Sequence, residues 1–166
     1  MSAVDLVTPE LRARIGEVKI YTAPEPIGKA AIRYFSLAVG DLNPLYLDEE
    51  YAVKHGYDGV IAPPTLICET NQYAGLPRDE SGYAGHSWHF HVPHTRQMRG
   101  GNDYEFFQPV SPEDILTVTW RVADICERSS KAGIRMVIVT SEASFRNQHD
   151  ELLATNVETL IFQERE

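Results

Sequence analysis

The sequence predicts one α+β domain in which several helices precede a curved, mostly antiparallel sheet. Apolar residues recur at helical spacing in the first half of the chain, whereas residues from Asn102 onward alternate between apolar and polar with the period of a strand. The length of 166 residues suits a single domain, because domains usually take roughly 100 to 200 residues. We therefore interpret residues 1–166 as one domain with one core.

The first long helix is predicted over residues 27–39, and Gly40 is a natural stop signal for it. Its apolar residues share one face, which we expect to pack on the core. Lys29, Arg33 and Ser36 fall on the opposite face. The predicted core-facing residues are Ile27, Ala31, Tyr34, Phe35 and Ala38.

Two further helices are predicted before the sheet. Residues 48–55 form a short one, with Asp48 as its N-cap and Gly56 as its terminator. Residues 64–74 form a second core helix, because a proline occupies the first turn and apolar residues follow at helical spacing. This helix ends before Gly75.

Five strands are predicted, rich in β-branched and aromatic residues. Between the helices and the last strands, residues 77–101 are the least regular part of the chain. A connection of this length is often a binding loop or a lid, although a variable surface insertion would have the same sequence features. The predicted strands cover residues 18–21, 102–110, 116–122, 134–145 and 152–162.

Composition excludes several classes of function. The net charge of -9 argues against a nucleic-acid partner, which would require concentrated Lys and Arg. No apolar run is long enough to cross a membrane, and the N-terminus lacks the pattern of a secretory signal, so we expect a cytoplasmic protein without a membrane partner. The two cysteines, Cys68 and Cys126, are predicted to be buried structural thiols.

The most informative stretch is Gly-Asp-Leu-Asn-Pro-Leu-Tyr at residues 40–46, which precedes Ile-Ala-Pro-Pro-Thr at residues 61–65. By itself the first stretch is a good turn, because Asp41 or Asn43 can form an Asx-turn and Pro44 stops the helix from resuming. Together, the two stretches resemble the hydratase motif of the MaoC-like hot-dog family. The resemblance continues through residues 100–106 and 109–110 and covers roughly residues 15–162.

The resemblance implies a hot-dog fold, in which a curved antiparallel sheet wraps around a central helix. It is closest to the N-terminal-type, FAS1-like dehydratase subunits of (R)-specific enoyl-thioester hydratases and 3-hydroxyacyl-thioester dehydratases. In this family an Asp and a His five residues later hold the water that adds across an enoyl thioester. Asp41 and Tyr46 occupy these two catalytic positions here, so a tyrosine replaces the histidine. A tyrosine, with a reference pKa near 10, is a poor general base at neutral pH.

The resemblance also implies a substrate site and partners. An enzyme of this family needs no cofactor, and its substrate would be an acyl-CoA or acyl-carrier thioester of fatty acid or lipid metabolism. The acidic balance of the chain slightly favours coenzyme A over an acyl-carrier protein. Backbone N–H groups would stabilise the thioester oxygen, starting at Thr65 because the two preceding prolines have none. The expected substrate-binding residues are Asn43, Pro64, Thr65, Leu66, Gly100 and Gly101.

The missing histidine implies a shared site, completed by a second MaoC-like subunit that carries the full motif. We expect a homodimer when the chain is alone. Strands rich in β-branched residues, such as residues 136–140 and 157–161, would promote aggregation if an edge were left unpaired. Two other functions remain open. The chain could be a non-catalytic acyl-thioester-binding or scaffold subunit, or a hot-dog thioesterase.

Four histidines, His86, His89, His91 and His94, crowd the irregular segment and suggest a metal site. No Asp or Glu lies between Gly82 and His94, and a loop without supporting residues holds a metal poorly, so we predict no metal. One of these histidines could instead replace the missing motif histidine.

Overall fold

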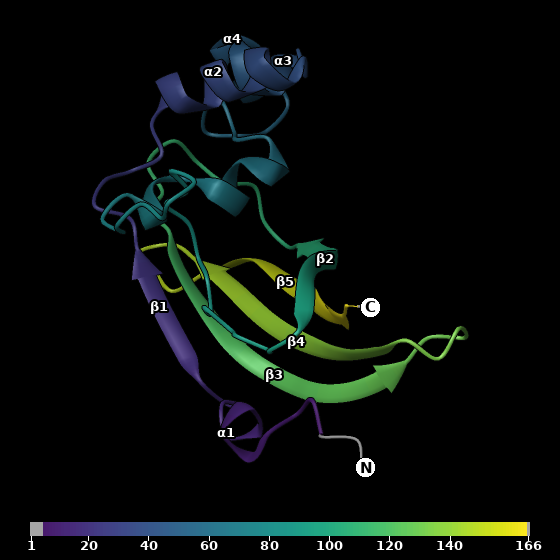
Figure 1. Cartoon of the computed structure of the whole chain (residues 1–166). Helices are drawn as coiled ribbons and strands as arrows, with labels where there is room; N and C mark the ends of the chain where they lie inside the picture. The colour runs from purple at the N-terminus through teal and green to yellow at the C-terminus, as the bar shows by residue number, and fades with distance from the viewer. Residues whose placement is uncertain (1–4, 166) are drawn as a thin grey trace.

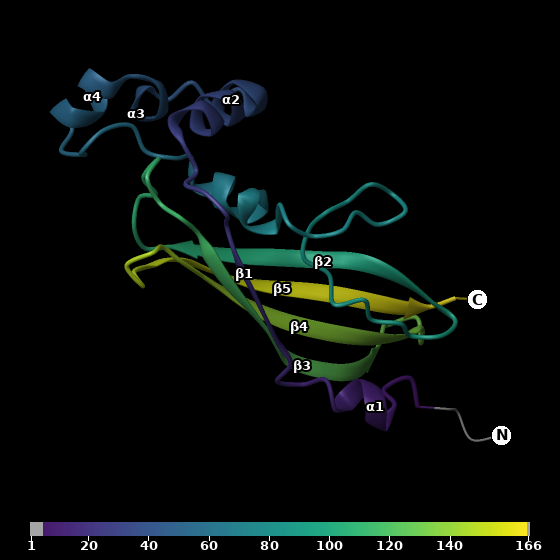
Figure 2. The same ribbon diagram turned by 90° about the vertical axis from the view of Figure 1, so that its left-hand side faces the viewer.

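The computed structural model describes residues 5–165, apart from the side chain of Glu69. Its centre is one curved sheet of five antiparallel strands in the order β1-β3-β4-β5-β2, with the helices earlier in the chain (Figures 1 and 2). This confirms the predicted α+β hot-dog fold. The strands are β1 (Val18–Thr22), β2 (Thr95–Phe106), β3 (Thr117–Ser129), β4 (Arg135–Arg146) and β5 (Leu152–Glu164).

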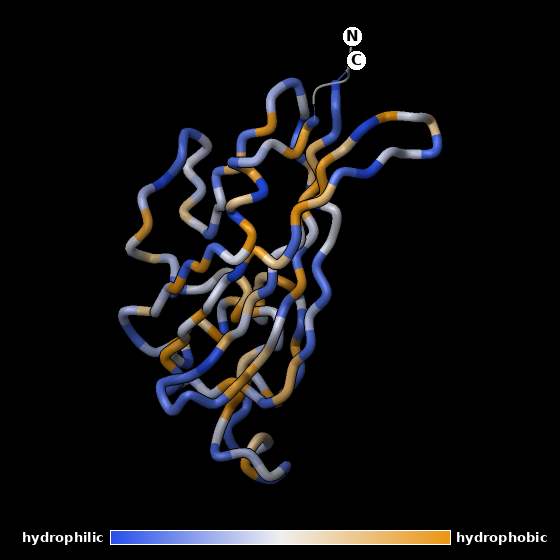
Figure 3. Tube along the Cα trace, turned by 90° about the horizontal axis from the view of Figure 1, so that it is seen from below, coloured by the Kyte–Doolittle hydropathy of each residue, from blue (hydrophilic) through white to orange (hydrophobic). Residues whose placement is uncertain are grey.

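Alternation of side chains along β3, β4 and β5 defines the buried inner face of the sheet. Val118, Phe145 and Ala154 lie side by side across these strands, and all three are fully buried. Hydrophobic and hydrophilic positions follow one another closely along much of the trace (Figure 3). Tight turns at residues 129–133 and 147–150 join β3 to β4 and β4 to β5.

The first half of β2 is a difference from the sequence prediction. We expected a strand only from Asn102 onward, but β2 begins at Thr95, so residues 95–101 belong to the sheet. A bulge between Arg99 and Gly101 shifts the register against β5, and most of this edge strand is exposed. The two features remove the regular alternation by which a strand is recognised.

The strand order also corrects our prediction of which strands have an unpaired edge. Residues 136–140 and 157–161, which we regarded as hazardous, lie in β4 and β5, and both strands are paired on both sides. The strands with one unpaired side are β1 and β2.

Four short α-helices accompany the sheet. The helices α2, α3 and α4 form a cluster beyond one end of it, whereas α1 lies near the other end (Figures 1 and 2). The predicted caps are confirmed: Asp48 accepts from the Tyr51 N–H at the start of α4, and Gly40 ends α2 with a φ of 74°. The helices are α1 (Pro9–Arg12), α2 (Lys29–Val39), α3 (Pro44–Leu47) and α4 (Glu49–Lys54).

The predicted core face of the 27–39 helix is only partly right: Ile27 is buried and Phe35 packs against the core, but the other three predicted residues are exposed. Ile32 and Ser36 are the fully buried residues of this helix, and the Ser36 hydroxyl donates to the Ile32 carbonyl. Tyr34 is 66% exposed, and Ala31 and Ala38 are also exposed. The error has a physical cause: α2 lies in the cluster beyond the sheet, so the sheet does not cover its broad apolar side (Figure 2).

The predicted central helix over residues 64–74 is also wrong in type. The chain forms two 3₁₀ segments, η1 (Pro64–Glu69) and η2 (Asn71–Tyr73), separated by an extended Thr70. The buried Gln72 side chain explains the break. Its amide donates to the Ile67 carbonyl at 2.8 Å, and in an α-helix that carbonyl would accept from the backbone N–H of Asn71.

Other expectations are met in part. Cys68 and Cys126 were expected to be buried, but each is only partly buried. The longest α-helix in residues 5–165 is α2, and none of the helices there has the length and apolar character to span a bilayer.

Replacing Gln72 by Met should destabilise the protein. The substitution keeps the volume but leaves the buried Ile67 carbonyl without the amide donor, which costs about 1–3 kcal/mol. The free energy of unfolding in urea measures this loss. Gln108→Met is the matched control, since Gln108 is exposed, and it should change stability by less than about 0.5 kcal/mol. Equal stabilities for the two variants would contradict this account of η1 and η2.

Candidate functional site

The motif at residues 40–46 forms a tight turn between α2 and α3. The Asp41 carboxylate accepts from the Asn43 N–H at 3.2 Å, and the Asn43 side chain accepts from the Leu45 N–H at 3.1 Å. Pro44 then begins α3. Asp41 and Asn43 are therefore turn-forming residues, whatever further role they have, and the exposed Asp41 side chain is open to solvent.

Tyr46 lies in α3 and is buried in the core. Burial raises the pKa of its phenol, and the nearby negative charge of Asp41 raises it further, against the opposing effect of a hydrogen bond with Asn43. The phenol therefore stays protonated at neutral pH. It sits within the electrostatic reach of Asp41, but it cannot accept a proton as the family's histidine would.

The second part of the predicted site, at Pro64, Thr65 and Leu66, is the first turn of η1. A backbone hydrogen bond from the Ile61 N–H to the Leu45 carbonyl, 3.0 Å long, connects the segment before η1 to α3. Pro64 and Thr65 are exposed, whereas Leu66 is buried in the core. The motif and the start of η1 are thus brought to neighbouring positions.

Gly100 and Gly101 lie in a different place. They form the bulge of β2 opposite Thr159, in the middle of the edge strand. A Cβ atom on Gly100 would come within 2.9 Å of the Thr159 methyl group, so close packing against β5 accounts for this glycine. Among the contacts of residues 5–165, we find no hydrogen bond that links either glycine to the motif or to η1.

Sequence reasoning missed the role of residues 86–92, which we call the inner segment. Trp88, Phe90 and Val92 are buried against the sheet, and the indole N–H of Trp88 donates to the buried Ser141 hydroxyl at 2.9 Å. Arg14 donates to the Trp88 carbonyl at 2.8 Å, and Lys19 donates to the Ser87 carbonyl at 2.9 Å. The alternation of these three apolar residues with histidine was the available signal.

His86 is the least ordinary side chain of the inner segment. Its ring stacks on Trp120 with centroids 4.4 Å apart, and its Nδ1 lies 3.1 Å from the Tyr21 hydroxyl. Its Nε2 is buried with no hydrogen-bond partner. Burial, reinforced by the positive charge of Lys19, lowers the pKa of His86 to about 3, so the ring is neutral.

The other three histidines of the cluster, His89, His91 and His94, are exposed. Within the described part of the chain, no three His, Cys, Asp or Glu side chains are placed together to hold a metal ion. The recorded contacts of His86 are with Tyr21, Trp88 and Trp120 rather than with Asp41.

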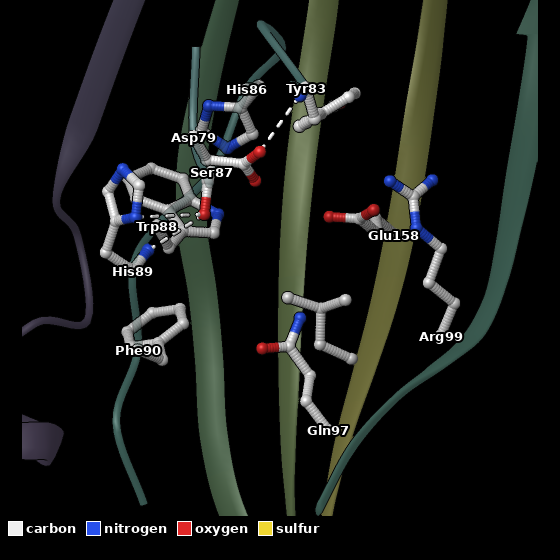
Figure 4. A pocket seen from close by; sticks show the side chains of 11 residues that line it. Asp79, Tyr83, His86, Ser87, Trp88, His89, Phe90, Gln97, Arg99 and Glu158 are labelled. Carbon is white, nitrogen blue, oxygen red and sulfur yellow. Dashed lines mark hydrogen bonds between the residues drawn. The ribbon is translucent and has the colours of Figure 1, made fainter. Parts of the chain in front are cut away.

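A cavity of about 320 Å³ lies between the inner segment and the edge of the sheet (Figure 4). His86, Trp88 and Phe90 form one side of it, and Arg99, Glu158 and Leu160 form the other. Glu158 was not among the predicted site residues, although it is the carboxylate on the buried side of β5.

Comparison with known proteins places these features in a family. The family model described as "FAS1-like, dehydratase domain region" matches residues 13–156. The chain belongs to this FAS1-like dehydratase family. Its fold is the hot-dog fold of the MaoC-like dehydratases, which confirms the resemblance drawn from the motif.

Two curated relatives and one solved structure illustrate the likeness. A UPF0336 protein of Streptomyces coelicolor is 34% identical over 130 residues, which cover 78% of this chain and 77% of that protein. A probable enoyl-CoA hydratase alpha subunit of Thermomonospora curvata is 28% identical over 137 residues, 79% of this chain but 43% of that longer protein. The ChsH1-ChsH2 complex of Mycobacterium tuberculosis has a chain that matches with a TM-score of 0.72 at 18% identity, covering 95% of this chain and 89% of its own.

The neutral, partly buried His86 should make the free energy of unfolding depend on pH. The ordinary pKa near 6.5 applies to the unfolded chain and a pKa of about 3 to the folded one, so the unfolded chain binds more protons between these values. The neutral ring therefore makes its full contribution to the free energy of unfolding above about pH 6.5, and this contribution declines as the pH falls. At pH 5 the loss should be about 2 kcal/mol relative to pH 7.5.

Urea unfolding of the wild type and of His86→Phe at these two pH values tests this expectation. The Phe variant keeps a ring on Trp120 and removes the titrating group, so its loss of stability on acidification should be smaller by about 2 kcal/mol. His91→Phe is the control at an exposed position of the same segment and should behave as the wild type. The same pH dependence in all three proteins would show that His86 is not the titrating group.

Proposed function

We propose that this chain is a subunit of an enoyl-CoA hydratase or 3-hydroxyacyl-thioester dehydratase, which adds water reversibly across a trans-2-enoyl thioester. The observation that carries the proposal is the motif turn with Tyr46 in the histidine position. The turn keeps Asp41 at the surface, but the raised pKa of the buried phenol leaves the chain without the second acid-base group. A partner subunit with the full motif supplies that histidine.

The chemistry explains why one group is insufficient. Hydration needs a base that activates water, an acid that delivers a proton to the α-carbon, and donors for the negative charge on the thioester oxygen. The backbone N–H groups at the start of η1 are candidate donors, since Thr65 is exposed and lies after the two prolines. Proton transfer is worth roughly 10² to 10⁴ in rate, so its loss leaves at most weak activity.

Exposed apolar surface next to the motif supports a partner on this side. Tyr34, Leu37 and Leu42 are each more than half exposed, and they surround the end of α2 where the motif begins. Apolar side chains gathered in this way are typical of an interaction surface. The alpha-subunit name of the Thermomonospora curvata relative, and the two-protein assembly of the Mycobacterium tuberculosis structure, agree with an enzyme of more than one subunit.

The acyl tail is proposed to run along η1 and η2 toward the inner segment. These 3₁₀ segments take the place of the longer α-helix expected under the sheet, and the cavity beside Trp88 is the space that the inner segment, β2 and β5 enclose. The thioester then lies near Thr65, as the motif resemblance implies. Coenzyme A is the preferred carrier because of the acidic balance of the chain, in keeping with the name of the Thermomonospora curvata relative, a probable enoyl-CoA hydratase alpha subunit.

A second function is favoured by the same observation. A chain that lacks the motif histidine could bind the acyl thioester, or stabilise its partner, without contributing to the chemistry. In that case the exposed Asp41 serves only the turn, through its hydrogen bond to Asn43. Activity measurements on designed motif variants separate the two functions.

The purified wild-type chain should hydrate crotonyl-CoA poorly, well below the rates of about 1 to 10³ per second that enzymes reach. Tyr46→His should raise the rate by about 10² or more, because the imidazole titrates near neutral pH beside Asp41. The loss of absorbance of the enoyl thioester measures the rate. Tyr51→His adds a histidine on α4 outside the motif and should not raise it.

Adding Asp41→Asn to the Tyr46→His variant should abolish the gain if Asp41 has a chemical role. If the increase in rate survives this second change, Asp41 serves only the turn, which supports the binding or scaffold function of the chain. Wild-type activity in the ordinary enzyme range would contradict the shared-site proposal altogether.

Alone, the chain should form a homodimer through the edge of β2, with a mass of about twice 18.7 kDa by light scattering. Phe106→Asp places a charge on this edge, where Phe106 is 39% exposed, and should shift the protein toward the monomer. Ile20→Asp on β1, the other edge, is the matched control and should leave the dimer intact. A wild-type monomer at micromolar concentration would refute assembly through the sheet.

A further inference from the structure

An open groove of about 700 Å³ lies at the end of the sheet where β2 starts and β5 ends. Its floor is apolar, because the buried rings of Phe90 and Phe162 lie there. Its rim is polar, and among residues 5–165 no Asp or Glu lines it, although the whole chain has a net charge of -9. The polar residues of the rim are His91, His94, Thr95, Gln97 and Arg165.

Three side chains of this rim have no partner within the part of the chain that the structure describes. Arg165, His94 and Gln97 take part in no side-chain hydrogen bond, ion pair or ring contact there. The Arg165 N–H donates to the His94 carbonyl at 2.9 Å, so the first two residues are held side by side. Glu164, the neighbour of Arg165, faces the Arg135 guanidinium at 3.9 Å instead. The rim therefore offers a cationic group and further donors to a ligand.

Donors above an apolar floor suit a ligand that combines phosphate groups with a flat ring. A guanidinium binds phosphate oxygens in a bidentate manner, and imidazole and amide N–H groups add donors. A nucleoside ring would cover the apolar floor. The volume of the groove lies within the roughly 300–1,000 Å³ of small-molecule sites. Coenzyme A ends in a phosphorylated nucleoside of this kind.

Within one chain, the groove and the proposed thioester site lie at opposite ends of β2. The strand runs over 12 residues from Thr95 at the groove to Phe106, a length of roughly 40 Å. The chain beyond Phe106 leads to Val110, whose carbonyl accepts from the Ala62 N–H at 2.8 Å just before η1. Figure 2 shows the α2–α4 cluster and the end of β5 at opposite ends of the sheet.

Pairing of two β2 edges brings the two ends together between chains. A closed dimer has a two-fold axis, and when this axis is perpendicular to the sheet the two edge strands run antiparallel. With the axis near the middle of β2, Thr95 of one chain lies near Phe106 of the partner subunit. The groove of each chain then faces the η1 end of its partner, on the same side of the joined sheets.

We propose that the groove binds the phosphorylated nucleoside of coenzyme A while the thioester of the same molecule lies in the partner subunit's site. The inference rests on the proposed function and on its dimerisation through β2. The Arg165 guanidinium and the His94 imidazole donate to the phosphate oxygens, and the Gln97 amide adds a third donor. A chain without the motif histidine thereby takes part in binding the substrate that its partner converts.

Binding to the full-length chain tests the groove, with crotonyl-CoA compared with crotonyl-pantetheine, which lacks the phosphorylated nucleoside. By isothermal titration the wild type should bind crotonyl-CoA about tenfold or more tightly, since hydrogen bonds to charged groups are strong. Adenosine 3′,5′-bisphosphate alone should also bind, more weakly at high salt.

Arg165→Gln should lose most of this preference for crotonyl-CoA, and His94→Asn should lose part of it. Asparagine suits position 94 because it tolerates the φ of 59° found there. Arg128→Gln is the matched control, since Arg128 is an exposed arginine of β3 outside the groove, and it should keep the preference.

Mixed dimers test whether the groove serves the partner's site. The double variant Tyr46→His/Arg165→Gln should have a KM for crotonyl-CoA about tenfold above that of Tyr46→His, with a similar kcat. Excess wild-type chain should restore the lower KM, because the mixed dimer places an intact groove beside the histidine-bearing site. The Arg165→Gln chain, added in the same excess, should not restore it.

The outcomes separate the inference from the proposed function. Equal binding of crotonyl-CoA and crotonyl-pantetheine, or a preference unchanged in Arg165→Gln, overturns the groove and leaves thioester binding in place. A KM that wild-type chain does not restore overturns the placement beside the partner's site. Binding of neither thioester, or an inactive Tyr46→His chain, counts against the proposed function, and binding of the bisphosphate and its loss in Arg165→Gln then decide the groove.

Discussion

The inner face of the curved sheet has to be covered, and the rest of this structure depends on how that is done. In a hot-dog domain one helix under the sheet could provide the cover. Here the segment under the sheet breaks into η1 and η2, because Gln72 occupies the Ile67 carbonyl and Thr70 is extended. Two short 3₁₀ segments bury less of the sheet than one long helix, so a second piece of chain is required.

The inner segment is that second piece. Trp88 and Phe90 provide the apolar area, while Arg14 and Lys19 hold the backbone through hydrogen bonds to its carbonyl groups. An irregular segment has no internal ladder of hydrogen bonds, so its buried polar groups depend on side chains from elsewhere. His86 is incompletely satisfied in this arrangement, since its Nε2 is buried without a hydrogen-bond partner and its pKa falls to about 3.

Covering the sheet in two pieces also leaves space between them and the edge strand. The cavity beside Trp88 and Glu158 lies in that space, at a distance from the motif turn along the chain and in the fold. The chemistry proposed at Asp41 and the cavity beside Glu158 therefore belong to different structural elements. The first depends on a partner's histidine, whereas the second is built from residues of this chain alone.

The sequence by itself determined the fold class, the caps at Asp48 and Gly40, the starts of four of the five strands to within a residue, and the turn at Asp41. These features depend on neighbours in the chain: a capping side chain, a glycine with positive φ, or alternation along a strand. The same local reasoning, with the motif resemblance, identified the family. It also indicated that Tyr46 could not act as the base, because an ordinary phenol pKa is already too high.

Only the tertiary structure decided which face of α2 is buried, where β2 begins and what lies under the sheet. Each of these depends on residues far away in the sequence: the position of the cluster beyond the sheet exposes Tyr34, and pairing with β5 makes residues 95–101 a strand. Glu158 is the clearest case. Its place in an alternating strand could be read from the sequence, but its meeting with Arg99 across a cavity required the packing of β2, β5 and the inner segment.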